Sequence, residues 1–220
     1  MNQEVNVTCY NFLDYKTALD IQERAVKGIQ HENFPEQLYL LQHNHVITLG
    51  RGGNPLNLLI DRESLKARGV EFFETGRGGD ITYHGPGQLV GYPILQLSGV
   101  EKDVRKYLNS IEEVLIRTLK DFEIAASRIP GLTGVWVGDN KIAAIGVRLS
   151  RWVTSHGFAL NVGPDLGYFQ LITPCGISDK GVTSMEVVLN RKIEVTEVAR
   201  VLIKHFGDVF KRTLKGDYVN

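Results

Sequence analysis

Three stretches of the sequence carry apolar residues at the three- and four-residue spacings of an amphipathic helix. The first covers residues 16–33, and Asp14 is placed to cap its start. The second and longest covers residues 102–125, and its length suits a helix lying across a sheet. The third follows Thr196, which we expect to cap the last helix of the chain.

Short runs rich in β-branched and aromatic residues lie between these helices and favour strands. We expect strands over residues 38–41, 46–49, 70–74, 92–97, 134–137, 142–149 and 152–162, and a short helix over 61–68. Strands outnumber helices and do not alternate with them strictly. The predicted fold class is therefore α+β (mixed α/β), with helices packed on a mixed β-sheet. No linker rich in Pro, Gly or Ser divides the chain, so we treat residues 1–220 as one domain.

Composition and charge exclude several classes of protein. Lys and Arg number 25, as do Asp and Glu, and the resulting net charge of zero argues against binding nucleic acid through global charge. Two cysteines, Cys9 and Cys175, are too few for a disulfide scaffold and fit a reducing compartment. No stretch approaches the ~18 apolar residues of a membrane span, and no signal peptide is evident at the start. We expect a cytoplasmic protein that binds neither nucleic acid nor membrane.

A glycine-rich segment over residues 76–91 is predicted to be a long loop. Its glycines match neither the dinucleotide fingerprint nor the phosphate-binding P-loop. Composition leaves two interpretations about equally open: tight turns with solvated polar residues, or a loop that binds a ligand. The pair Tyr83 and His84 favours the second, because a turn needs polar residues but not this pair.

Two further residues could carry chemistry. Cys175 stands between a proline and a glycine, in a turn whose N–H groups could form an oxyanion site, although a free cysteine is more often a small buried hydrophobe. Lys141 precedes an apolar strand and could point into a pocket, although a lysine at a turn is usually solvated. Cys9, in a strand-like run, is assigned no role. The six histidines lack metal-site spacing, so we expect no metal and no cofactor.

Four runs of sequence, in this order and spacing, resemble the lipoyl (octanoyl) transferase family: RGGDITYHGPGQLVGYP, GDNKIAAIGVR, HGFALNV and TPCGI. The resemblance covers roughly residues 49–185, and the run from Arg77 to Gln88 satisfies the family signature without departure. Such enzymes move an octanoyl (or lipoyl) group from octanoyl acyl carrier protein to a lysine of lipoyl domains. The implied acceptors are the lipoyl domains of 2-oxoacid dehydrogenases and the glycine cleavage H protein. The family shares its fold with biotin and lipoate protein ligases, which implies a mixed sheet with helices on one side.

The resemblance also implies roles for individual residues. Cys175 would be the acyl-thioester nucleophile, and Lys141 its partner in proton transfer. Whether Lys141 acts as a cation that favours the thiolate or as a neutral base stays open. His84 is a competing base that we rank as a pocket or orienting residue. The implied substrate-binding residues are Arg77, Gly78, Gly79, Asp80, Ile81, Thr82, Tyr83, His84, Ala144, Ile145, Gly146, Gly157, Phe158 and Ala159.

Two expectations concern the substrate. An eight-carbon chain needs a narrow apolar slot, which small residues such as Gly146 could leave open, so Gly146→Leu should shorten the preferred chain. Acidic protein partners would dock on a basic rim, for which Arg51, Arg148 and Arg151 are candidates.

Three alternatives keep part of this interpretation. An ATP-using lipoate or biotin ligase would have the same fold but needs no cysteine nucleophile. A non-catalytic acyl-binding module would keep the slot and lose Cys175 or Lys141, and both residues are present. A relative that moves octanoyl groups between lipoyl domains would keep the chemistry and change only the donor.

Overall fold

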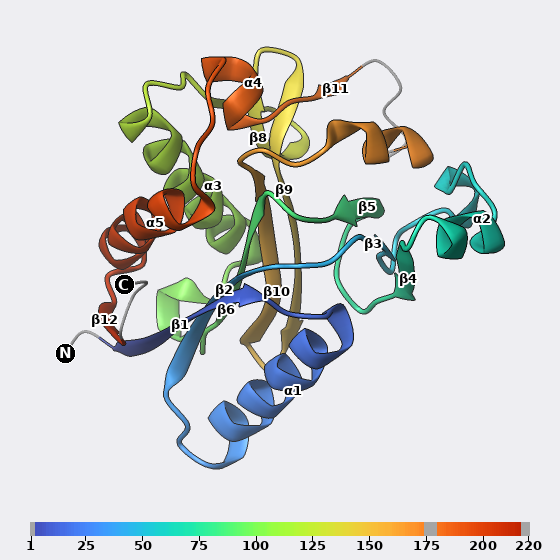
Figure 1. Ribbon diagram of the computed structural model, residues 1–220. Coiled ribbons are helices and arrows are strands. Elements are labelled where there is room, and N and C mark those ends of the chain that lie inside the picture. The colour runs from blue at the N-terminus through green and yellow to red at the C-terminus, as the bar shows by residue number, and fades with distance from the viewer. Residues whose placement is uncertain (1–2, 174–179, 217–220) are drawn as a thin grey trace.

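The structure, a computed structural model, describes residues 3–173 and 180–216 (Figure 1). The helices are α1 (Tyr15–His31), α2 (Arg62–Ala67), α3 (Val104–Asp121), α4 (Met185–Leu189) and α5 (Val195–Phe210), and short 3-10 turns are η1 (Pro55–Asn57), η2 (Gly99–Glu101) and η3 (Leu166–Leu171). The strands are β1 (Glu4–Phe12), β2 (Glu36–Gln42), β3 (Val46–Leu49), β4 (Glu71–Glu74), β5 (Ile81–His84), β6 (Gln88–Ile94), β7 (Ser127–Ile129), β8 (Leu132–Val137), β9 (Asn140–Ser150), β10 (Val153–Asn161), β11 (Gly181–Val182) and β12 (Thr213–Lys215). No helix in the described part of the chain is long and apolar enough to cross a membrane.

The strands of the described residues form two sheets. The larger has nine strands in the order β12-β1-β2-β6-β10-β9-β8-β7, with β11 added beside β9. In it, β1 runs parallel to β2 and β12, and β11 runs parallel to β9, whereas the remaining neighbours are antiparallel. The smaller sheet has the order β4-β3-β5. The predicted mixed sheet with packed helices is confirmed.

Helices cover both faces of the larger sheet, so the expectation of helices on one side is wrong. Helices α3 and α5 share one core with Leu38 and Leu40 of β2, whereas α1 shares another with Tyr39 and Leu41 of the same strand. Figure 1 shows α1 on the opposite side of β1 and β2 from α3 and α5. Successive side chains of a strand point to opposite faces, so an unbroken apolar run needs a cover on each face.

The glycine-rich segment departs most from its prediction. It contains strand β5 and the start of β6, where a long loop over residues 76–91 and a strand over 92–97 were expected. The residues of β5 pair with β3, so a partner distant in sequence makes this segment extended. Thr196 is also not the cap of the last helix, because Glu194 occupies that position. The remaining predicted helices and strands are present within a few residues of their expected ends.

Arg212, which precedes β12, fixes the end of the described chain to the sheet. Its Nε donates to Glu36 Oε2 at 2.8 Å, and its two terminal nitrogens donate to the carboxylate of Glu101 at 3.0 and 3.2 Å. The side chains of Arg212 and Glu36 are only 5% and 7% exposed. Without the guanidinium, Glu36 would be a buried charge lacking its partner.

We expect Arg212→Leu to lower the free energy of unfolding by about 3–5 kcal/mol, because it breaks a buried ion pair from one side. Urea denaturation measures this loss. Lys215→Ala is the control: its ion pair with Glu4 is more than half exposed, and such pairs contribute about 1 kcal/mol or less. Equal losses in the two variants would contradict the prediction.

Candidate active site

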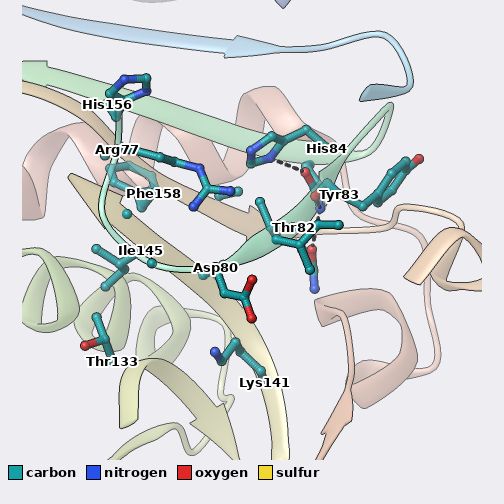
Figure 2. Close-up of a pocket in the computed structure, with 18 of the residues that line it drawn as sticks. Arg77, Asp80, Thr82, Tyr83, His84, Thr133, Lys141, Ile145, His156 and Phe158 are labelled. Carbon is teal, nitrogen blue, oxygen red and sulfur yellow. Dashed lines mark hydrogen bonds between the residues drawn. The ribbon is translucent and has the colours of Figure 1, made fainter. Parts of the chain in front are cut away.

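A cavity of about 460 Å³ lies between strands β9 and β10 of the larger sheet, the segment that contains β5, and the start of α1. Lys141 lines it together with the following residues expected to bind substrate: Arg77, Gly79, Asp80, Ile81, Thr82, Tyr83, His84, Ala144, Ile145, Gly146, Gly157, Phe158 and Ala159 (Figure 2). Gly78 does not line it, because its N–H donates to the Val147 carbonyl at 2.8 Å and holds the segment against β9. Cys175 lies outside the described residues.

The floor of the cavity is the β9–β10 hairpin. Ala144 pairs with Ala159, and Gly146 pairs with Gly157, so four small residues lie together on these two strands. An added Cβ at Gly146 would lie 2.9 Å from the carbonyl oxygen of Gly78 and 3.2 Å from Cδ of Arg77. The missing side chain of Gly146 therefore makes room for Arg77 and Gly78. We had expected it to leave an acyl slot open instead.

A β-bulge turns Lys141 toward this floor. Val135 of β8 pairs with Ala143, but the next residue, Trp136, pairs with Lys141, so Ile142 is one extra residue on β9. Ile142 and Ala143 both pack in the core that contains α3 and α5. With strict alternation Lys141 would point to that core. The extra residue instead places it on the same face as Ala144.

Arg77 and Asp80 are held by polar groups of the loops around them. Arg77 donates to the Thr48 carbonyl at 2.7 Å and to the Thr48 hydroxyl at 2.8 Å, in a buried position. The carboxylate of Asp80 accepts from the Asn57 amide at 2.5 Å and from the backbone N–H of Asn54 at 3.1 Å. Figure 2 shows Asp80 and Lys141 pointing toward one another across the cavity.

His84 is part of a buried hydrogen-bond network with the side-chain amides of Gln88 and Asn161. The Gln88 amide nitrogen donates to the Asn161 side chain at 2.9 Å, so Gln88 Oε1, 3.2 Å from His84 Nδ1, is the acceptor in that contact (Figure 2). His84 therefore carries its proton on Nδ1. The Asn161 amide nitrogen in turn donates to the carbonyl of Thr183, whose N–H donates to the Lys141 carbonyl. These hydrogen bonds connect the glycine-rich segment to β9 and to Thr183, which directly follows β11.

Two more buried histidines lie at or beside the cavity. His43 is 2.7 Å from both the Leu13 carbonyl and the Tyr92 hydroxyl, so Nδ1 donates to the carbonyl and Nε2 accepts from the hydroxyl. His156 lines the cavity with a φ of +57°, a conformation that few residues adopt, and its N–H donates to the Gln22 side chain at 2.7 Å. Helix α1, which carries Gln22, thus holds this bend of β10 in place.

Burial keeps these three histidines neutral. It lowers the pKa of His43 and of His156 to about 4, and the pKa of His84 well below 6.5, with the charge of Arg77 adding to the effect on His84 and His156. A His84 of such low basicity is suited to orienting a substrate by hydrogen bonding and poorly suited to accepting its proton at neutral pH.

The free energy of unfolding should therefore fall as the pH falls from about 6.5 toward 4. The unfolded chain binds protons on these histidines below their ordinary pKa of 6.5, whereas the folded chain takes them up only near pH 4. We expect His43 and His156 each to contribute about 2 kcal/mol to the loss between pH 7 and pH 5. Urea denaturation at both pH values measures it. His156→Asn should reduce the measured loss by about 2 kcal/mol, and asparagine tolerates the positive φ at this position. An unchanged loss would contradict the assignment.

Sequence reasoning missed several residues of the cavity wall. These are Tyr15, Gly52, Gln88, Tyr92, Gly131, Leu132, Thr133, His156, Asn161, Phe169 and Val182. Gln88 lies within the recognised signature, so that motif could have included it. Tyr15 is the first residue of helix α1, far away in sequence. The apolar spacing of that helix predicts that its inner face is buried, but not which cavity Tyr15 lines.

Two of the three arginines expected to form a basic rim lie beside the same segment, and the third lies in the turn of the β9–β10 hairpin. The backbone N–H of Arg51 donates to the Arg77 carbonyl, and the Arg148 side chain lies against Gly76, so both border the segment that contains Arg77. Arg151 lies in the turn at the other end of the β9–β10 hairpin, ten residues or about 30 Å along the strand from Lys141. Among the described residues, no group of three His, Cys, Asp or Glu side chains is arranged to hold a metal ion.

Comparison with known proteins gives a consistent result. Residues 14–207 match the lipoyl protein ligase A/B catalytic domain family. The chain is 54% identical over 198 residues to an octanoyltransferase of Solibacter usitatus, covering 90% of this chain and 89% of that one. It is 48% identical to an octanoyltransferase of Christiangramia forsetii, covering 98% and 99%. A crystal structure of lipoate-protein ligase A bound with ATP superimposes with a TM-score of 0.78 at 15% identity, covering 100% of this chain and 90% of that one, which shows a shared fold.

Proposed function

We propose, from the premise that this chain belongs to the octanoyltransferases of the lipoyl protein ligase A/B catalytic domain family, that Cys175 carries the octanoyl group as a thioester. The protein is an acyltransferase that acts in the transfer of octanoyl or lipoyl groups. The proposed donor is octanoyl acyl carrier protein, and the proposed acceptor is the lysine of a lipoyl domain. We further propose that residues 1–220 form one acyltransferase domain.

The observation that carries the proposal is that Lys141 lines the cavity to which the described residues before and after Cys175 are attached. Before Cys175, the N–H of Thr173 donates to the Asn57 carbonyl, and the Asn57 amide holds Asp80. After Cys175, Val182 pairs with Lys141 itself. Both ends of the segment that contains the cysteine are thus attached to residues of the cavity wall or their direct partners.

In the proposed reaction, the Cys175 thiolate attacks the thioester carbonyl of the donor. A carbon–sulfur bond to Cys175 forms, the bond to the carrier thiol breaks, and the carrier thiolate takes a proton from Lys141. The acceptor amine then attacks the new thioester, so that an amide bond forms and the bond to Cys175 breaks. Lys141 takes the proton of the amine, and the Cys175 thiolate is regenerated. Transfer of the acyl group from one thiol to another is nearly isoenergetic, and formation of an amide from a thioester lowers the free energy. Neither step therefore requires ATP.

The cavity suits an acyl chain near the small residues of β9 and β10. Ala144 and Ala159 form an apolar pair on its floor, close to Ile145 and Phe158. Burying each methylene contributes about 0.8 kcal/mol, so contacts along the chain can select its length.

Ala144→Leu is expected to shift the preference toward shorter chains. A leucine side chain at this floor position would displace about two methylenes, so the kcat/KM ratio of octanoyl to hexanoyl donor should fall about tenfold. Competition between the two donors measures the ratio. Gly146→Leu, in contrast, should push away Arg77 and Gly78 and slow transfer of both chains alike. A tenfold shift in Gly146→Leu with none in Ala144→Leu would contradict this placement.

The test of the proposed function is the intact mass of the protein after mixing with octanoyl acyl carrier protein in the absence of ATP. We expect one added octanoyl group, released by hydroxylamine, mapped by peptide mass to Cys175, and discharged by a lipoyl domain. Transfer that appears only with ATP and free octanoate would instead indicate the ligase chemistry. An acyl-enzyme that forms equally well from an octanoylated lipoyl domain would indicate that alternative donor.

A further inference from the structure

The side chain of Lys141 packs against two residues of strand β8, Trp136 and Gly134. Its Nζ is 4.7 Å from the centre of the Trp136 ring, over the ring face. The two residues are direct partners in the β8–β9 pairing, on the face that the bulge at Ile142 exposes to the cavity. A cation at this distance from an indole face is attracted by the electron density of the ring.

Gly134 makes room for the rest of the lysine side chain. It has a φ of +127°, and a Cβ added there would lie 3.3 Å from Lys141 Cε and 2.7 Å from the Ala143 carbonyl oxygen. The N–H of Gly134 donates to Glu112 Oε1 at 3.1 Å, and the other oxygen of this buried carboxylate accepts from Arg128 at 2.9 Å. Helix α3, through Glu112, thus fixes the part of β8 on which the lysine lies.

A purely space-filling role does not explain the tryptophan. Trp136 is 1% exposed, and its indole Nε1 is buried with no hydrogen-bond partner among the described residues. A buried donor without a partner lowers stability, which a phenylalanine or leucine in the core would avoid. The indole face attracts a cation more strongly than a phenylalanine ring does, and here it is turned toward Lys141.

We propose that Trp136 is a positioning residue for Lys141, because its ring face holds the ammonium group on the cavity side of β9. Gly134, held by its hydrogen bond to Glu112, leaves the space that the lysine side chain occupies. The inference rests on the proposed function for the consequence of this contact, because only there is Lys141 the group that moves protons. The contact itself is a property of the resting protein.

The contact is tested by NMR of the protein labelled with ¹³C at the lysine ε-carbons. We expect the ε-methylene signal of Lys141, assigned with Lys141→Arg, to be displaced upfield by the ring current of Trp136. Trp136→Phe should keep most of this displacement, and Trp136→Leu should abolish it. An ε-methylene signal that is not displaced in the unsubstituted protein, or that Trp136→Leu leaves unmoved, would overturn the proposal.

The consequence is tested without changing the shape of the core, by replacing Trp136 with mono-, di- and trifluorotryptophan. Trp152→Phe provides the background, because the chain has only two tryptophans and the other is on the surface. Fluorine withdraws electrons from the ring face, so the single-turnover rate should fall stepwise to a total of about two- to fivefold. KM for the carrier protein should stay constant. An equal rate across the series would overturn the positioning role.

Failure of this inference is distinguishable from failure of the proposed function. If Lys141→Ala transfers octanoyl groups as fast as the unsubstituted protein, the proposed role of Lys141 is wrong, and the positioning role falls with it. If Lys141→Ala is inactive while the fluorinated series and Trp136→Leu keep full rates, the proposed function holds and the role of Trp136 alone is refuted.

Discussion

Replacement of Cys175 by alanine is expected to lower octanoyl transfer by about 10⁴-fold or more, because the proposed reaction has no second nucleophile to carry the acyl group. The rate is measured as octanoylation of a lipoyl domain at saturating octanoyl carrier protein, and intact mass should show no acyl-enzyme. Cys175→Ser should either form no adduct or hold the group as a stable oxygen ester, since an alkoxide leaves far less readily than a thiolate.

Cys9→Ala is the matched control, because the chain contains only these two cysteines. Cys9 is a partly buried residue of β1, packed against the core that contains α3 and α5, and burial raises the pKa of its thiol. A cysteine in that environment is a poor nucleophile at neutral pH. The variant should transfer at the normal rate. Loss of activity in Cys9→Ala, or full activity in Cys175→Ala, would contradict the assignment of the nucleophile.

Lys141→Ala is expected to slow transfer by about 10²- to 10⁴-fold, the usual contribution of a positioned proton-transfer group. Pre-steady-state kinetics should separate acylation of Cys175 from attack by the acceptor amine. Lys141→Arg distinguishes the two roles that the sequence leaves open, because arginine keeps the charge but does not give up its proton. Acylation that recovers in Lys141→Arg indicates a cation that stabilises the thiolate, whereas loss in both variants indicates that Lys141 must exchange a proton in this step.

An exposed lysine provides the control for these variants. Lys192 pairs with Glu186 on the surface, and its side chain is 90% exposed. Its replacement by alanine should leave both steps unchanged and alter stability by less than about 1 kcal/mol. Equal slowing in Lys192→Ala and Lys141→Ala would mean that the assay responds to total charge, and the role of Lys141 would be refuted.

The sequence by itself determined most of the elements and the members of the candidate site. Local signals suffice for an amphipathic helix, so α1 and α3 were predicted, and Asp14 caps α1 as expected. The motifs that carry the family resemblance also identified just over half of the residues that line the cavity, because the order of residues in a motif is itself local information.

Only the tertiary structure decided how those residues face one another. Strand β5 exists because β3 pairs with it, and no pattern inside the glycine-rich segment predicts that partner. Lys141 faces the cavity because one extra residue, Ile142, breaks the alternation of β9 opposite β8. Gly146 leaves room for Arg77 and Gly78, since this segment, far away in sequence, packs there. Each outcome depends on contacts between residues distant along the chain, and the periodicity of a single segment carries no information about them.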